Sequence, residues 1–387
     1  MKNFISKNIL YLIYIFYFVF IFLIFFYSER SISGVNFSNG YLLGNDSFRY
    51  IDGANNILNF TVPDSNKGTS YLGYIFILIP FQYFKLDLTY VVIFQIFLTL
   101  ISSYCLYKIS KELSSPLGGI ISLTFYLFYF PLQIYNLYIL TETIFICTII
   151  FIIYFIVFYK KKFLSILIFL LILFLLLRPH GILIIPIMVL SLGFWSIIEK
   201  DTKIFYSLIF VLLIIAYPSF LLLNYYLETE SMISQIANMG IIVGYENPNN
   251  LLNFTQPLNE NNDLFSLLSY LKNNMVVFFE SFYKKIYFFL IRIRPYYSEL
   301  HNLYLILFNL LYYPLAIYGV LKFELKNKIY YYFMLLYIFV FTVSIGFSFA
   351  DWDSRYSLYI LPLIFIFSGV GFSHIEKTKF IKKLFKN

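Results

Sequence analysis

Apolar runs of membrane-spanning length constrain this chain more than any other feature of its sequence. A helix needs about 20 apolar residues to cross a hydrocarbon core of ~30 Å. Allowing for tilt, such runs fall at 8–27, 88–107, 117–137, 143–159, 163–177, 181–198, 204–223, 302–321, 329–349 and 356–373. They predict an all-α polytopic membrane protein, one transmembrane domain over 1–387, with about ten spanning helices and a range of roughly nine to twelve.

The composition excludes a soluble fold, because 60% of the residues are hydrophobic and only 12% are charged. Phe (48) and Tyr (38) are over-used, and so are Ile, Asn and Lys. All five can be encoded by AT-rich codons, so aromatic stripes carry little functional weight. Cys105 and Cys147 lie inside apolar runs and are expected to be buried hydrophobic residues.

The distribution of charge predicts the topology. An even number of spans places both termini on one side. If that side is the cytoplasm, the inner segments hold 17 of the 28 basic and five of the 20 acidic residues, a net +12, and the remaining 11 basic and 15 acidic residues give −4 outside. This asymmetry follows the positive-inside rule, so both termini are expected in the cytoplasm and the first run is expected to be a retained anchor. The net charge of +8 then reflects topology, and no nucleic-acid partner is expected.

Two large segments, 28–87 and 224–301, are expected on the non-cytoplasmic side. Within the first, the apolar stretch 71–84 would form about 21 Å of helix, which is too short to span and indicates a half-helix on the outer surface. Within the second, the stretch 276–291 carries Glu280 and Lys284 in a favourable i, i+4 pair. That pattern predicts an amphipathic helix lying in the outer membrane interface.

The first outer segment contains the sequence GNDSFRYIDGANNIL at 44–58. Asn45 can cap a helix on which Asp46, Arg49 and Tyr50 share one face. Asp52 lies about 120° around from Asp46 on such a helix. The plainest interpretation is that Asp46 complements the helix dipole and that Asp52 is solvated.

Further polar residues fall on the same side of the membrane, at Glu142, at Arg178 and in the segment 351–356. Each has a plain explanation alone: Arg178 as a snorkelling anchor, or Trp352 as part of an aromatic belt. Together, however, acidic and basic groups from several helix ends converge on one face while the spans carry no charge near their centres. This distribution favours an outward-facing site over an ion-coupled transporter, which places charges near the bilayer midplane.

Four short motifs follow one another along the chain in a fixed order relative to the runs. They are D-S-x-x-Y-x-x-x-A at Asp46, T-E at Thr141, R-P-x-G at Arg178 and R-Y-x-x-x-x-x-P at Arg355, with a surface helix carrying Tyr71, Gly73 and Pro80 after the first. In this order the chain resembles the GT-C type glycosyltransferases, in the branch of protein O-mannosyltransferases and lipid A aminoarabinose transferases. The resemblance covers about 8–373.

The resemblance implies an enzyme that moves a sugar from a polyprenyl-phosphate carrier, with inversion, to an acceptor on the outer side. The acceptor would be a glycan, a lipid or a protein of the cell envelope, and the setting would be a bacterial inner membrane. The first acidic residue of the first outer loop is catalytic in such enzymes, which corresponds to Asp46 here. Ser47 stands where the family more often has a second acidic residue, so no cofactor is certain and a divalent metal stays open.

Elementary chemistry gives the same residues roles without the family. The acceptor needs a base, for which Asp46 is the candidate, and the departing phosphate needs positive charge. The phosphate-binding candidates are Arg178 and Arg355, with Arg49 and Lys67 as weaker ones. The candidates for binding substrate or orienting these groups are Tyr50, Asp52, Glu142, Asp351, Asp353 and Tyr356.

Three alternatives remain open. A polysaccharide polymerase or ligase would also use a lipid-linked donor, but it would depend on arginines in two later outer loops. A flippase or transporter is disfavoured by the uncharged spans, and nothing positive favours a membrane scaffold. A nucleotide-sugar donor is disfavoured because the sequence has no phosphate-cradling glycine loop or Rossmann-like unit. A lipid-linked donor would instead need a groove, expected beside the last spans and the 276–291 helix.

Overall fold

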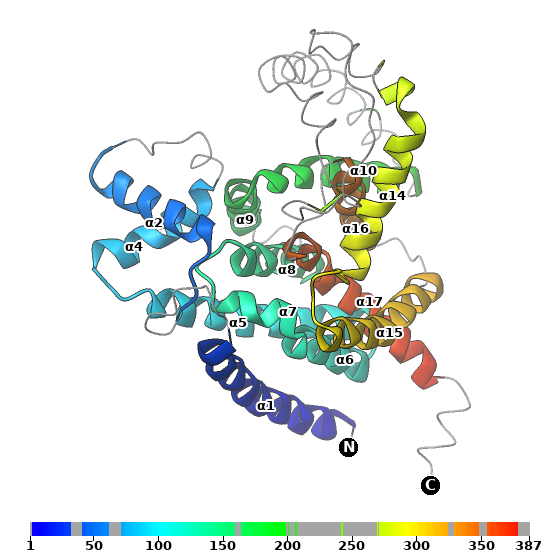
Figure 1. Ribbon diagram of the computed structural model, residues 1–387. Helices are drawn as coiled ribbons and strands as arrows, with labels where there is room; N and C mark the ends of the chain where they lie inside the picture. The colour runs from blue at the N-terminus through cyan, green and yellow to red at the C-terminus, as the bar shows by residue number, and fades with distance from the viewer. Residues whose placement is uncertain are drawn as a thin grey trace. The chain divides into compact units, whose positions relative to one another are not determined.

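The structure of the chain is a computed structural model, drawn in Figure 1. The described residues are 2–31, 41–61, 71–158, 164–198, 200, 206, 241–242, 269, 271–323, 329–347 and 354–377. They contain no β-strand, only an isolated bridge between Leu42 and Tyr138, so the all-α prediction is confirmed for this part of the chain. The chain divides into two units, one formed by Met1–Ile184, Phe308–Leu325 and Leu358–Asn387, the other by Ile185–Leu307 and Lys326–Ser357.

The helices of the first unit follow the apolar runs closely. They are α1 (Lys2–Ser31), α2 (Asn45–Leu58), α4 (Leu72–Tyr83), α5 (Thr89–Leu113), α6 (Pro116–Phe128), α7 (Phe130–Gln133), η1 (Ile134–Asn136), α8 (Glu142–Phe158), α9 (Leu164–Leu177), η2 (Pro179–Leu183) and α17 (Leu361–Lys377). The predicted short helix at 71–84 is confirmed as α4. Whether α4 lies on the outer surface stays a prediction.

One predicted span is broken. The run 117–137 forms α6 and then a second helical piece, Phe130–Asn136, with a bend of 61° between them. Tyr129 leaves helical geometry, with φ −79° and ψ 99°, and Pro131 follows in the first turn of α7. A proline in that position cannot donate the hydrogen bond that would continue α6, so α7 begins a new helix instead.

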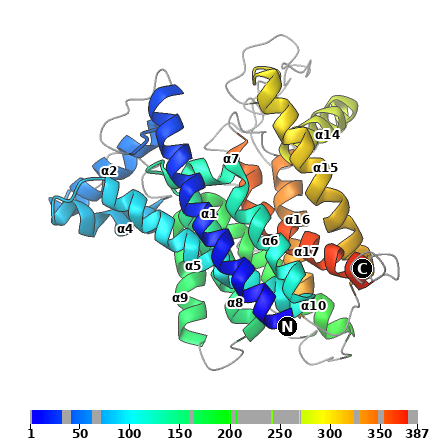
Figure 2. The same ribbon diagram turned by 90° about the horizontal axis from the view of Figure 1, so that it is seen from below.

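The first unit packs around α6. Helix α17 and helix α5 both lie against it, α8 packs on α5, and α1 runs along α6 as Figure 2 shows. The approach of α17 is very close, because a Cβ added to Gly118 would lie 2.5 Å from the carbonyl oxygen of Gly369. Ser122 reinforces it by donating to the Phe365 carbonyl at 2.7 Å. Small residues at a helix crossing are typical of membrane bundles.

The second unit contains α10 (Ile184–Ile198), α14 (Met275–Ile291), the first part of α15 (Glu299–Lys322), α16 (Ile329–Phe347) and most of η4 (Arg355–Tyr359). Helix α14 packs on α16, where the ring centroids of Phe282 and Phe347 lie 5.2 Å apart. The predicted helix at 276–291 and its Glu280–Lys284 pair, at 2.6 Å, are both confirmed.

Several helices are long and apolar enough to cross a membrane. Four described segments qualify, namely Thr89–Leu113, Pro179–Ile198, Glu299–Lys322 and Ile329–Phe347, and a fifth if the bent pair counts as one span. These helices are compatible with an integral membrane protein. The predicted number of about ten spans and the cytoplasmic termini stay predictions. Most of the run 204–223 and most of the segment 224–301 lie outside the described residues.

Candidate functional site

Helix α2 begins with a local exchange of hydrogen bonds. The side chain of Ser47 accepts from the Gly44 amide at 2.9 Å, and the Ser47 amide donates to the Gly44 carbonyl at the same distance. The N-cap is therefore Gly44, and the prediction of Asn45 as the cap is wrong. Ser47 is fully buried, and its hydroxyl helps to start the helix by accepting from the Gly44 amide.

The first turns of α2 carry a partly exposed charged pair. Arg49 donates to Asp46 at 3.1 Å, and the two side chains are 37% and 24% exposed. Tyr50 and Gly53, on the same face, are buried, whereas Asp52 is exposed. The predicted shared face is confirmed, and Asp52 is solvated as the plain interpretation expected.

A second charged pair lies in the interior of the first unit. Arg178 donates to Glu142 at 2.5 Å, and the side chains are 2% and 1% exposed. The Arg178 guanidinium also lies 5.8 Å from the ring centroid of Tyr71 and 5.3 Å from that of Tyr359. Aromatic faces stabilise a desolvated guanidinium, so the two rings complement the carboxylate.

A close helix approach positions Tyr71 at this pair. A Cβ added to Gly73 would lie 2.9 Å from the backbone carbon of Leu176, so only glycine lets α4 meet the end of α9 this closely. Arg178 follows that end directly, in extended backbone geometry before η2. Gly73 and the end of helix α9 at Leu177 thus bring Tyr71 and Arg178 together.

Tyr50 connects the two charged pairs. Its ring centroid lies 5.2 Å from that of Tyr71 and 5.3 Å from that of Tyr74. Burial raises the pKa of Tyr50 well above its usual range; the nearby carboxylates of Glu142 and Asp46 raise it further, and Arg178 opposes them. The Tyr50 hydroxyl therefore stays protonated at neutral pH and can donate a hydrogen bond but cannot act as a base.

A backbone bridge fixes α2 beside the start of α8. The Leu42 amide donates to the Leu137 carbonyl at 2.8 Å, and the Ile139 amide donates to the Leu42 carbonyl at 3.0 Å. Leu42 lies three residues before the start of α2, and Ile139 lies three residues before Glu142. These two bonds hold the segments that carry Asp46 and Glu142 next to each other.

The structure brings five of the predicted residues into one neighbourhood of the first unit: Asp46, Arg49, Tyr50, Glu142 and Arg178. Arg355 lies in the second unit, with its guanidinium 5.7 Å from the ring of Tyr356, which is buried. Its predicted convergence with Arg178 stays a prediction. Asp351, Asp353 and Lys67 lie outside the described residues.

Sequence reasoning gave Tyr71 only a place in a motif, and it missed Tyr74 and Tyr359. The position of Tyr71 two residues before Gly73 was the available signal, because a glycine in an apolar helix often marks a close approach. Nothing in the sequence distinguishes Tyr359 from the other 37 tyrosines of a chain that has 38. Its contact with Arg178 comes only from tertiary packing.

A buried hydroxyl lies beside the Glu142–Arg178 pair. The Thr141 hydroxyl, fully buried beside Glu142, has no hydrogen-bond partner among the residues that the structure describes. Within the same part of the chain, no three His, Cys, Asp or Glu side chains are grouped so as to hold a metal ion. The question of a divalent metal stays open.

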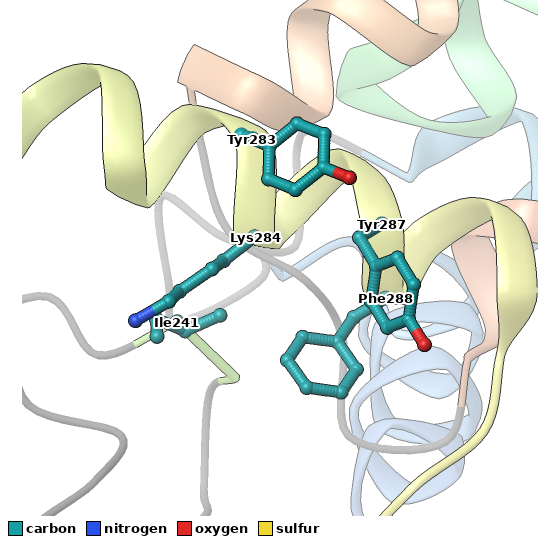
Figure 3. Close-up of a pocket in the computed structure, with 5 residues that line it drawn as sticks. All are labelled: Ile241, Tyr283, Lys284, Tyr287 and Phe288. Atoms are coloured by element: carbon teal, nitrogen blue, oxygen red, sulfur yellow. The ribbon is translucent and has the colours of Figure 1, made fainter.

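The second unit has a cavity along α14, shown in Figure 3, with a volume of about 330 Å³. It is lined by Tyr283, Lys284, Tyr287 and Phe288 of α14 and by Ile241, toward which the Lys284 side chain extends. The lining is mainly aromatic. The expected lipid groove beside this helix stays a prediction.

Comparison with protein-family models gives no match to this chain, and neither does comparison with curated proteins. The resemblance to GT-C glycosyltransferases thus stays a hypothesis.

Proposed function

We propose that this protein is a membrane glycosyltransferase that moves a sugar from a polyprenyl-phosphate carrier to an acceptor on the non-cytoplasmic side. One observation carries the proposal: Tyr50, one helical turn after Asp46 on α2, packs against Tyr71, and the ring of Tyr71 faces the Arg178 guanidinium that is paired with Glu142. These charged groups come from three separate regions of the chain. Clusters of charge in a largely apolar protein are typical of functional sites.

Asp46 is the proposed base. Its carboxylate is 24% exposed, so an acceptor can reach it. Asp46 accepts the proton of the acceptor hydroxyl or amine as that group attacks the anomeric carbon from the face opposite the phosphate. The bond between the anomeric carbon and the phosphate oxygen breaks, its electron pair stays on the carrier phosphate, and the configuration inverts.

Arg49 is the proposed first contact of the departing phosphate. It is the more accessible arginine, 37% exposed beside Asp46, whereas Arg178 is 2% exposed and already paired with Glu142. Positive charge next to the leaving oxygen stabilises the developing anion. These exposures favour Arg49 over Arg178 as the phosphate contact, and we propose that Arg178 instead holds Tyr71 and Glu142 in place.

The proposed orientation in the membrane rests on the charge asymmetry of the loops. The excess of basic residues at the inner segments favours cytoplasmic termini, so Asp46 would face outward from a bacterial inner membrane. A donor that reaches this side is lipid-linked, because nucleotide sugars are cytoplasmic.

The test is transfer by the purified full-length protein in detergent, with a panel of radiolabelled polyprenyl-phosphate sugars and cell-envelope acceptors. Asp46→Asn is expected to lower transfer at least about 100-fold, because it removes the base but keeps the shape of the side chain. The matched control is Asp87→Asn. Asp87 is an exposed carboxylate of the same outer segment, and the hydroxyl and amide of Thr89 hold its pKa below the usual value. Asparagine can still accept those bonds, so the control is expected to transfer normally.

Two results would contradict the proposal. Transfer by Asp46→Asn at the wild-type rate would remove the base assignment. Wild-type protein in liposomes that moves the lipid-linked sugar between leaflets, without transferring it to any acceptor, would favour the flippase alternative instead.

A further inference from the structure

Gln95 lies at the centre of the hydrogen bonds that support this site. It is on α5, fully buried, and no motif includes it. Its amide nitrogen donates to the Asn136 carbonyl at 3.0 Å and to the Tyr138 carbonyl at 2.8 Å. Its amide oxygen accepts from the Tyr74 hydroxyl at 3.2 Å.

The chemistry of the partners fixes the orientation of this amide. The two backbone carbonyls can only accept, so they must face the nitrogen of Gln95, and the oxygen must face Tyr74. A neutral amide is needed to donate to both carbonyls and accept from Tyr74. Asparagine has the same amide on a side chain that is one methylene shorter. An ionised glutamate would place an oxygen opposite both carbonyls, where neither group could donate.

The segments that Gln95 joins are those that carry the site. Tyr74 packs edge-on against Tyr50 of α2. The two carbonyls that Gln95 bonds belong to the turn 136–139. In the same turn, the Leu137 carbonyl and the Ile139 amide form the two backbone bonds to Leu42. That turn leads directly to Glu142.

We propose that Gln95 is a positioning residue that sets the spacing between α2, with Asp46 and Tyr50, and the start of α8, with Glu142. Its catalytic consequence rests on the proposed glycosyltransferase function. Gln95 touches no reacting group in this role; it acts through Tyr74 and the 136–138 backbone. A shift of the site by about 1 Å can cost on the order of 100-fold in rate.

The experiment compares Gln95→Met with wild type in the full-length protein, by two measurements. The first is hydrogen exchange followed by mass spectrometry, which does not depend on activity. Exchange in peptides covering 41–44 and 136–141 is expected to rise about tenfold, because the turn loses both side-chain donors. Peptides from α6 are expected to be unchanged. The second is the kinetics of transfer, in which kcat is expected to fall about 10- to 100-fold with KM within about threefold.

Two further variants separate positioning from general stability. Ser110→Ala removes a buried hydrogen-bonding hydroxyl from the other end of α5, where Ser110 bonds Ser122 and Gly118, and is expected to change neither measurement at the site. Gln95→Glu, protonated in this buried position, keeps one donor and is expected to give an intermediate effect, and it replaces Gln95→Met if that variant does not accumulate.

Unchanged exchange at 41–44 and 136–141 in Gln95→Met would overturn the positioning role. Faster exchange with unchanged kcat would overturn its importance for catalysis. If wild-type protein transfers no sugar at all, the proposed function fails, and the exchange measurement still decides whether Gln95 holds α2 and α8 in place.

Discussion

Two ion pairs, one in each unit of the molecule, have nearly the same geometry and very different surroundings. Glu142 and Arg178 of the first unit lie 2.5 Å apart, are 36 residues apart in sequence and are 1% and 2% exposed. Glu280 and Lys284 of α14 in the second unit lie 2.6 Å apart, one helical turn from each other, and are 54% and 42% exposed. Distance alone therefore says little about what each pair does for the protein.

The difference lies in desolvation. Removing one partner of a buried pair leaves the other charge without compensation in a medium that solvates it poorly. An exposed pair loses only a screened attraction, because water takes the place of the missing partner. The first pair should thus control both the stability and the shape of its unit, and the second should control neither.

The largest effect is expected from breaking the buried pair. Glu142→Gln should lower the free energy of unfolding by about 3–5 kcal/mol, because Arg178 keeps its charge in the interior. Thermal unfolding in detergent, followed by size-exclusion chromatography of the surviving fraction, measures the loss. Sugar transfer should fall with it, since Arg178 then holds Tyr71 less firmly.

A double variant sharpens this result. Glu142→Gln combined with Arg178→Met removes both charges and should recover much of the lost stability while transfer stays low. If Glu142→Gln alone unfolds at the wild-type temperature, water reaches Arg178 and the contrast between the two pairs disappears.

Two adjacent lysines on α14 offer a second contrast within one helix. The Lys284 side chain is 42% exposed, whereas Lys285 is buried, and burial lowers the pKa of Lys285 from 10.5 to about 8. Between about pH 8 and 10.5 the unfolded chain therefore binds more protons, and the free energy of unfolding should rise with pH across that window. Below it, the cost of burying the charge is fully present.

Lys285→Met should raise the free energy of unfolding at neutral pH by about 2–3 kcal/mol and remove the rise at alkaline pH. Lys284→Met, the matched control, should do neither. Thermal unfolding of the three proteins at about pH 7 and about pH 10 measures both effects. An equal response of the two lysine variants would show that Lys285 is solvated.

The sequence predicted the features that are local. Apolar runs predicted the helices, and the i, i+4 spacing predicted the Glu280–Lys284 pair, because both depend only on residues that are near one another in the sequence. The same holds for Asp46 and Arg49 on α2. The break at Tyr129 could have been read from Pro131, but an apolar run long enough to span hid it.

The features that make the site are not local and could not be predicted. The contact of Arg178 with Tyr359 joins residues that are 181 positions apart in the sequence. The bridge at Leu42 involves single residues without the alternating pattern of a strand. Gln95 has no motif, since its role depends on the three groups around it. The sequence thus indicated a set of candidate polar residues but not which of them are buried together.

The smallest effect is expected from the exposed pair on α14. Glu280→Gln, Lys284→Gln and the double variant should give a coupling energy below about 0.5 kcal/mol. The pair Asp46–Arg49, which is only partly exposed, should give a coupling below about 1 kcal/mol. Stability alone therefore barely separates these two surface pairs.

Sugar transfer should separate them clearly. Arg49→Gln should lower transfer about tenfold or more, because it removes the proposed phosphate contact, whereas Lys284→Gln should leave it unchanged. Since both variants remove one exposed positive charge from a helix, the comparison isolates position from charge. Equal transfer by the two variants would mean that the face of α2 is an ordinary solvated surface, and the contrast between the two units would then rest on the buried pair alone.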